Sequence, residues 1–193
     1  MIGGPSSENE LIRRARGGDA DAFAELVIRH ADRVQGALRR FGLDAGEADE
    51  VAQEVFLRAW RGLPRFEGRA QFSTWLYRIA FNEAQRRLGR RPRPRPEADP
   101  ERDDPIVSVP ESPRLGPEAR TLDHEFEQTL AQALGQLPAD WRAAVTLRDI
   151  EGLSTHEAAE IVGVGEAAFK SRLHRGRMQL RGLLEPYLQL EEG

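Results

Sequence analysis

The sequence contains no cysteine in 193 residues, and only one of its 28 basic residues is a lysine. The lack of cysteine excludes disulfides, thiolate metal sites and cysteine nucleophiles. No run of about 18 apolar residues occurs, so no transmembrane helix is expected. The first 18 residues lack the apolar segment of a signal peptide, and a cytoplasmic location is therefore predicted.

Motifs of catalysis and cofactor binding are also missing. The sequence HEAAE at residues 156–160 begins like the zinc motif HExxH but ends in glutamate. No P-loop, GxSxG or GxGxxG motif occurs. The four histidines are scattered, and none has the spacing of a metal site: they are His30, His124, His156 and His174. We therefore expect no enzyme activity, no metal and no cofactor.

Alternating strand patterns are almost absent, and apolar residues instead recur at helical spacing. Residues 11–41 carry such a helical face, with Asp19 as a plausible N-cap for its second half. Asp44 and Glu47 have the spacing of a capping box, which predicts the start of a further helix. That helix should end at Gly62, because glycine and a following proline stop helices.

The rest of the first domain is predicted as one loop and one helix. Residues 65–72 read as a loop, and Ser73 is placed to cap a helix over residues 74–90. These elements predict a compact helical domain over residues 1–91.

Residues 92–120 contain eight of the twelve prolines together with seven acidic residues. Such a segment offers too little apolar surface to offset the entropy of ordering it, so it is predicted to be an extended linker. The alternative is a rigid loop packed on one domain.

The second predicted domain spans residues 121–193 and contains a helix-turn-helix pattern. Ser154 and Glu157 form a second capping-box pair, residues 163–165 form a tight turn, and a long helix begins near Glu166. The fold class is thus all-α, with two small helical domains joined by a proline-rich extended linker.

The charge is unevenly distributed along the chain. Residues 58–96 hold eleven arginines against two acidic residues, whereas the whole chain has a formal net charge of −4. A second basic cluster lies between Lys170 and Arg181. Two cationic zones on an acidic chain indicate two separate contacts with a polyanion.

The last long helix is expected to bury Phe169, Leu173, Leu180 and Leu184. Its outward residues are polar or basic, as major-groove docking requires, because arginine and lysine pair with guanine and with phosphate. The alternative is a solvated basic helix in an unrelated bundle. The outward residues are Lys170, Ser171, His174, Arg175, Arg177 and Arg181.

The helix over residues 74–90 is the other cationic element. Trp75, Arg78, Asn82 and Arg86 fall on one face at spacings of three and four, and Arg69 adds positive charge nearby. Aromatic rings among arginines suit unstacked bases of single-stranded DNA. The alternative is that Trp75 belongs to the core and that the arginines form a solvated face.

An acidic and polar face is predicted on the preceding helix. It carries Asp49, Glu50, Gln53 and Glu54. Such a face either contacts a protein partner or is simply solvated.

Taken together, the sequence resembles the extracytoplasmic-function (ECF) sigma factors of bacterial RNA polymerase. The segments that carry the resemblance are AFAELVIRHADRVQGALRRFGLDAGEADEVAQEVFLRAWRGLPRF and FSTWLYRIAFNEAQRRLGRR for sigma domain 2, and LPADWRAAVTLRDIEGLSTHEAAEIVGVGEAAFKSRLHRGRMQL for sigma domain 4. The order and spacing of the three segments make the resemblance specific.

The resemblance implies a role for each segment. The acidic helix would dock on core RNA polymerase, the linker would run through polymerase channels, and an anti-sigma factor would be a further partner. The core-binding residues would be Asp49, Glu50, Gln53 and Glu54. The −10 promoter element would be bound and opened by Arg69, Trp75, Arg78, Asn82 and Arg86. The −35 element would be bound by Lys170, Ser171, Arg172, His174, Arg175 and Arg177.

The sequence departs from the family pattern at Ala168, where a small polar residue usually precedes the apolar position, and its linker is long for the family. Two other functions fit parts of the pattern. One is a stand-alone helix-turn-helix regulator that binds operator DNA as a dimer. The other is a protein that mimics a sigma factor and sequesters core polymerase.

Overall fold

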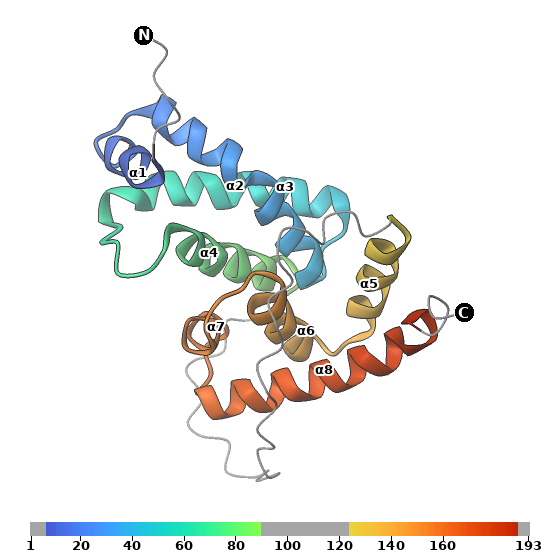
Figure 1. Ribbon diagram of the computed structural model, residues 1–193. Helices are drawn as coiled ribbons and strands as arrows, with labels where there is room; N and C mark the ends of the chain where they lie inside the picture. Colours follow the sequence, from blue (N-terminus) through green and yellow to red (C-terminus); the bar gives the residue numbers. More distant parts are fainter. Residues whose placement is uncertain (1–6, 90–123, 189–193) are drawn as a thin grey trace. The chain divides into compact units, whose positions relative to one another are not determined.

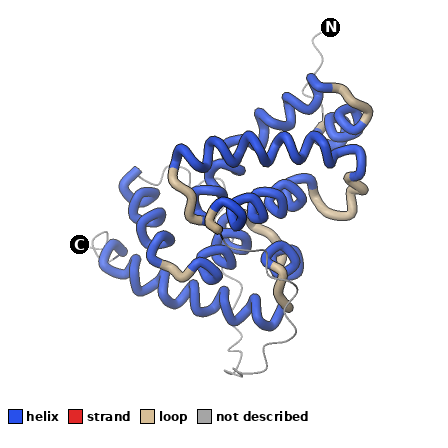
Figure 2. Tube along the Cα trace, turned by 180° about the vertical axis from the view of Figure 1, so that it is seen from behind, coloured by secondary structure: helices blue, strands red, loops and turns tan. Residues whose placement is uncertain are grey.

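The computed structural model describes residues 7–89 and 124–188, and every regular element in these two ranges is helical (Figures 1 and 2). The chain divides into two compact units, which are described separately. The predicted linker at residues 92–120 lies outside the described residues. Within the described ranges, no helix has both the length and the apolar character that crossing a membrane requires.

Over residues 7–89, the first unit contains four α-helices and a short 3-10 turn. They are α1 (Glu8–Arg16), α2 (Ala20–Phe41), α3 (Ala45–Gly62), η1 (Leu63–Arg65) and α4 (Phe72–Arg87). Its core includes the fully buried side chains of Leu26, Leu38, Val55 and Leu76. Helix α3 packs against α4, so the predicted acidic and cationic helices are direct neighbours (Figure 1).

The predicted caps form at the helix starts of this unit. The Glu47 amide donates to Asp44 Oδ1 at 2.8 Å, and Glu47 closes the capping box at the start of α3. The Ala22 amide donates to Asp19 Oδ1 at 3.0 Å, which caps α2. These bonds satisfy backbone donors that have no partner inside the helix.

The start of α4 differs from the prediction. The helix begins at Phe72 rather than Thr74, and its N-cap is Gln71, which makes no side-chain capping bond. Phe72 is buried among aromatic rings, and this packing, rather than the Ser73 hydroxyl, fixes where the helix begins.

The second unit contains α5 (His124–Gln136), α6 (Ala139–Val145), a π-helical turn η3 (Thr146–Ile150), α7 (Thr155–Val162) and α8 (Glu166–Leu188). The predicted capping box of Ser154 and Glu157 starts α7. Gly163 ends α7 in the left-handed region at φ 73°, which a residue with a side chain rarely adopts. Helix α8 then follows as the second helix of the helix-turn-helix.

Helix α8 lies across α6 at Gly176. A Cβ atom at this position would lie 2.8 Å from Cγ2 of Val145 and 3.1 Å from the Trp141 carbonyl oxygen. Phe169 and Leu173 are buried, as predicted. The prediction that Leu180 and Leu184 are buried is wrong, since both are only half-buried. The helix is covered less completely beyond its crossing with α6.

Candidate nucleic-acid and protein interfaces

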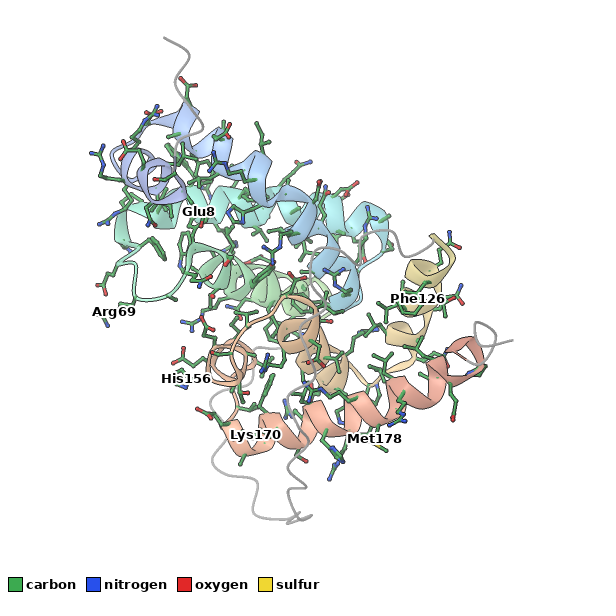
Figure 3. The ribbon with its side chains drawn as sticks, in the orientation of Figure 1. Glu8, Arg69, Phe126, His156, Lys170 and Met178 are labelled. Atoms are coloured by element: carbon green, nitrogen blue, oxygen red, sulfur yellow. The ribbon has the colours of Figure 1, made fainter. Side chains whose placement is uncertain are left out.

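The outward face of α8 is the first candidate interface. Lys170 and His174 are exposed one turn apart, and the exposed Met178 follows at the same spacing (Figure 3). Ser171 is half-buried beside them. Met178 was not among the residues predicted on this face, although its spacing of four residues from His174 places it there.

Two arginines of α8 point toward their own unit. Arg177 donates to Asp149 through Nε at 2.9 Å and Nη2 at 2.6 Å. Nη2 of Arg172 lies 3.5 Å from Oδ2 of Asp140. Both guanidinium groups are thus engaged by carboxylates of preceding elements, whereas the helical spacing had placed Arg177 among the outward residues and the family resemblance had implied a −35 contact for Arg172.

Helix α4 carries the second candidate interface. Arg78, Asn82 and Arg86 are exposed, as their common face requires. Arg86 donates through Nη1 to the buried carboxylate of Glu83 at 2.8 Å. Arg69 projects from the loop before α4 and pairs with Glu67 at 2.6 Å (Figure 3).

Trp75 belongs to an aromatic cluster under that loop. Its ring centroid lies 5.1 Å from that of Phe66 and 5.7 Å from that of Phe72. A Cβ atom at Gly62 would lie 3.1 Å from Cζ2 of Trp75. The side chain remains half-buried, so the ring helps to pack the loop and also keeps part of its surface in solvent.

His30 packs against the same aromatic cluster at Phe72. Its buried imidazole lies edge-on to the Phe72 ring, with centroids 5.3 Å apart, and its Nε2 lies 3.2 Å from Oε2 of Glu8. Burial lowers the pKa of His30, and the carboxylate of Glu8 opposes this shift. A neutral imidazole therefore links α1 to the start of α4.

The polar face of α3 is the third candidate interface. Asp49, Glu50 and Gln53 are exposed, and Glu54 is half-buried beside Arg58 with an Oε1–Nε distance of 2.9 Å. Glu50 accepts a hydrogen bond from Nη2 of Arg87 at 2.9 Å. The predicted polymerase-binding and DNA-binding helices thus share ion pairs.

An open apolar groove of about 730 Å³ runs between α2 and α3. Phe23 and Trp60 stack in it with ring centroids 4.9 Å apart. Its polar lining residues are Gln35, Asp49 and Gln53, two of which belong to the predicted polar face. The apolar lining includes Phe23, Val27, Ala31, Phe56, Leu57 and Trp60. The sequence did not predict this groove, because helical periodicity does not distinguish the side chains of a core from those that line an open groove.

Neither unit offers a metal centre among its described residues, where no cluster of three or more histidine or carboxylate side chains is arranged to hold an ion. His156 instead faces Glu166, with Nδ1 and Oε1 3.1 Å apart.

Both described parts of the chain resemble known proteins. Residues 26–93 match the family described as Sigma-70 region 2, and residues 127–180 match Sigma-70, region 4. The chain is 37% identical over 185 residues to the RNA polymerase sigma-H factor of Pseudomonas aeruginosa, with 94% of this chain and 96% of that protein covered. It is 34% identical over 187 residues to the ECF RNA polymerase sigma-E factor of Escherichia coli strain K12, with 95% and 97% covered.

Two solved structures are similar over most of their length. The structure of CnrH in complex with the cytosolic domain of CnrY has a TM-score of 0.65 and 28% sequence identity, and the match covers 94% of this chain and 99% of that chain. The sigma factor RpoE of Bartonella quintana, in complex with the anti-sigma factor NepR, has a TM-score of 0.62 and 26% identity, with 84% and 96% covered. On these similarities and on the two matched regions, the chain belongs to the extracytoplasmic-function sigma factors, which are transcription initiation factors of bacterial RNA polymerase.

Proposed function

We propose that this sigma factor binds core polymerase through α3, engages the −10 element through α4 and the loop before it, and binds the −35 element through α8. One observation carries the proposal: each unit presents an exposed helix face with basic residues, around Arg78 and Arg86 in the first and around Lys170 and His174 in the second. A factor that contacts two promoter elements needs two such faces.

The −35 contact is supported by the helix-turn-helix geometry. The second helix of this motif enters the major groove with its N-terminal residues nearest the base edges. Lys170, Ser171 and His174 occupy the first turns of α8, where side chains reach base edges and phosphates.

The −10 contact is supported by the aromatic cluster. Phe66 and Phe72, at the two ends of the loop before α4, pack ring against ring. This contact fixes the loop beside the exposed face of α4, and together they form a platform. Base stacking on such a platform contributes roughly 1–3 kcal/mol per base, and this stabilisation favours the melted strand. Asn82 supplies an amide that both donates and accepts hydrogen bonds at a base edge.

The polymerase contact is supported by the groove beside α3. Its apolar lining and the carboxylate of Asp49 complement an amphipathic helix with basic residues, and we assign this groove to such a helix of the polymerase's largest subunit. Glu50 and Glu54 extend the acidic charge along α3 beyond the groove.

The remaining assignments rest on the family. Residues 1–91 and 121–193 would be sigma domains 2 and 4, joined by residues 92–120. The polymerase would perform all nucleotide chemistry, so the chain itself has no catalytic residue, and it would work in the cytoplasm with that enzyme. CnrH and RpoE were solved with CnrY and with the anti-sigma factor NepR. An anti-sigma factor is accordingly a proposed partner of this chain.

Run-off transcription from promoter libraries, with the purified chain and sigma-free core polymerase from its own bacterium, tests the proposal. Discrete transcripts that share two spaced upstream elements are expected. Binding to polymerase without transcripts would instead support the polymerase antagonist. Specific DNA binding without any polymerase binding would support a stand-alone regulator.

A further inference from the structure

We propose that Arg177 positions the recognition helix through Asp149 and does not contact promoter DNA. This inference rests on the proposed function of α8 at the −35 element. Within that candidate site it separates Lys170 and His174, which face outward, from Arg172 and Arg177, which hold the helix.

The hydrogen-bonded pair has the geometry of a structural clamp. The Nε and Nη2 atoms of Arg177 donate to the two oxygens of Asp149, at 2.9 Å and 2.6 Å. The exposed fractions of the two side chains are 28% and 29%. Hydrogen bonding to Asp149 raises the pKa of Arg177 despite partial burial, so the charged form is favoured. The forked edge of the guanidinium, which would otherwise grip a phosphate, is occupied.

The pair of Arg177 and Asp149 lies beside the crossing of α8 and α6. Asp149 lies on η3, which follows α6 directly, and Arg177 is adjacent to Gly176, where α8 crosses α6. The pair therefore restrains the rotation of α8 about its own axis beside its crossing with α6. A small rotation there would move every outward side chain relative to the DNA groove.

A second pair acts on the other flank of α8. With 3.6 residues per turn, Arg172 and Arg177 border the buried stripe of Phe169, Leu173 and Gly176 on opposite sides. Arg172 is 22% exposed, and its Nη2 lies 3.5 Å from Oδ2 of Asp140 at the start of α6. The helix is thus held on both sides of the stripe, while Lys170 and His174 face solvent.

The test compares initiation by the reconstituted holoenzyme on a promoter with an intact −35 element and on the same promoter with that element scrambled. The ratio of the two rates cancels any change in the folded fraction of a variant. Asp149→Asn and Arg177→Lys are the test variants, because the first removes the acceptor charge and the second keeps the positive charge but loses the fork. Glu185→Gln is the matched control, since it removes one exposed acid from the same helix.

A positioning role predicts that Asp149→Asn and Arg177→Lys each lower the ratio by about tenfold, as loss of a hydrogen bond to a charged group implies. The double variant should be no worse than either single variant, because both disrupt one interaction. Glu185→Gln should leave the ratio within about twofold of the wild type, as a surface change away from the clamp.

If Arg177 instead contacted a DNA phosphate, neither variant would lower the ratio of the two rates. Arg177→Lys would then retain the wild-type ratio, and Asp149→Asn would raise it, because Arg177 would be released toward DNA. Either result overturns the inference while leaving the proposed function intact. A wild-type ratio of one on a competent polymerase would instead overturn the −35 assignment itself, and the inference with it.

Discussion

The Oε1 atom of Glu83 lies 2.9 Å from the Nε atom of Arg58. Glu83 belongs to α4 and Arg58 to α3, so this ion pair joins the helix proposed to contact DNA to the helix proposed to bind polymerase. The other Glu83 oxygen accepts from Arg86 at 2.8 Å. Only 7% of the Glu83 side chain is exposed, so its carboxylate contacts these two guanidinium groups and little water.

Glu83→Gln should therefore lower the free energy of unfolding by about 1–2 kcal/mol, less than for a fully buried pair because both arginines are partly exposed. Urea denaturation of the purified chain measures this change. Glu54→Gln is the control, since Glu54 contacts the same Arg58 from a more exposed position and should cost about 0.5 kcal/mol or less. Equal losses in the two variants would show that the burial of Glu83 has no energetic consequence.

Gly176→Ala should destabilise the second unit. Its new methyl group would lie 2.8 Å from Val145 Cγ2 and 3.1 Å from a backbone oxygen, so α6 and α8 would have to separate. Such overpacking costs about 1–3 kcal/mol, measured by urea denaturation.

Gly182→Ala is the matched control in the same helix, because no heavy atom lies within 4 Å of its added Cβ. Alanine there should stabilise α8 by about 0.5–1 kcal/mol, as glycine is a poor helix former. If Gly176→Ala stabilised the second unit as Gly182→Ala is expected to, the close crossing at Gly176 would be refuted.

Local signals in the sequence predicted much of this fold. The capping boxes at Asp44 and Ser154 and the end of α3 at Gly62 depend on residues within one turn of each other. Such interactions are visible in a linear pattern, because the partners are fixed by helical spacing.

Long-range partners could not be predicted in the same way. Glu83 is an acid within a basic helix, and one of the two cations that hold its buried carboxylate, Arg58, belongs to another helix. Arg177 has the spacing of a DNA-binding residue, yet its partner Asp149 lies 28 residues earlier. The start of α4 was also misplaced, because the burial of Phe72 outweighed the capping preference of Ser73.

Trp75→Ala should lower the free energy of unfolding by about 2–3 kcal/mol, since the ring contacts Phe66, Phe72 and Gly62 but is not fully buried. Trp75→Phe keeps an aromatic ring in the cluster and should cost about 1 kcal/mol. Urea denaturation gives both values.

The same two variants separate packing from base contact. If the exposed part of Trp75 stacks on a melted base, Trp75→Phe should slow open-complex formation more than its small loss of stability implies. Permanganate footprinting of the −10 region measures this. Unchanged opening in the phenylalanine variant would assign Trp75 to packing alone.

His30 should make the first unit less stable in mild acid. Burial places the folded-state pKa of His30 below the value of about 6.5 expected in the unfolded chain. The nearby cations Arg29 and Arg33 lower this pKa further, whereas the carboxylate of Glu8 raises it. Below pH 6.5 the unfolded chain therefore binds more protons at this residue. Its contribution to stability is complete above that pH and is lost as the pH falls toward the folded-state pKa.

His30→Gln should flatten this dependence, because glutamine does not titrate. Urea denaturation at pH 7.5, 6.5 and 5.5 should show the free energy of unfolding falling less in this variant than in the wild type. His174→Gln removes an exposed histidine and should keep the wild-type slope. Because protonation strengthens the contact of His30 with Glu8 but places a charge against the buried Phe72 ring, it would disturb the packing at the start of α4. Amide hydrogen exchange at the first turn of α4 should therefore quicken in mild acid beyond the intrinsic pH effect. If the free energy of unfolding fell equally with pH in His30→Gln and His174→Gln, this link would be contradicted.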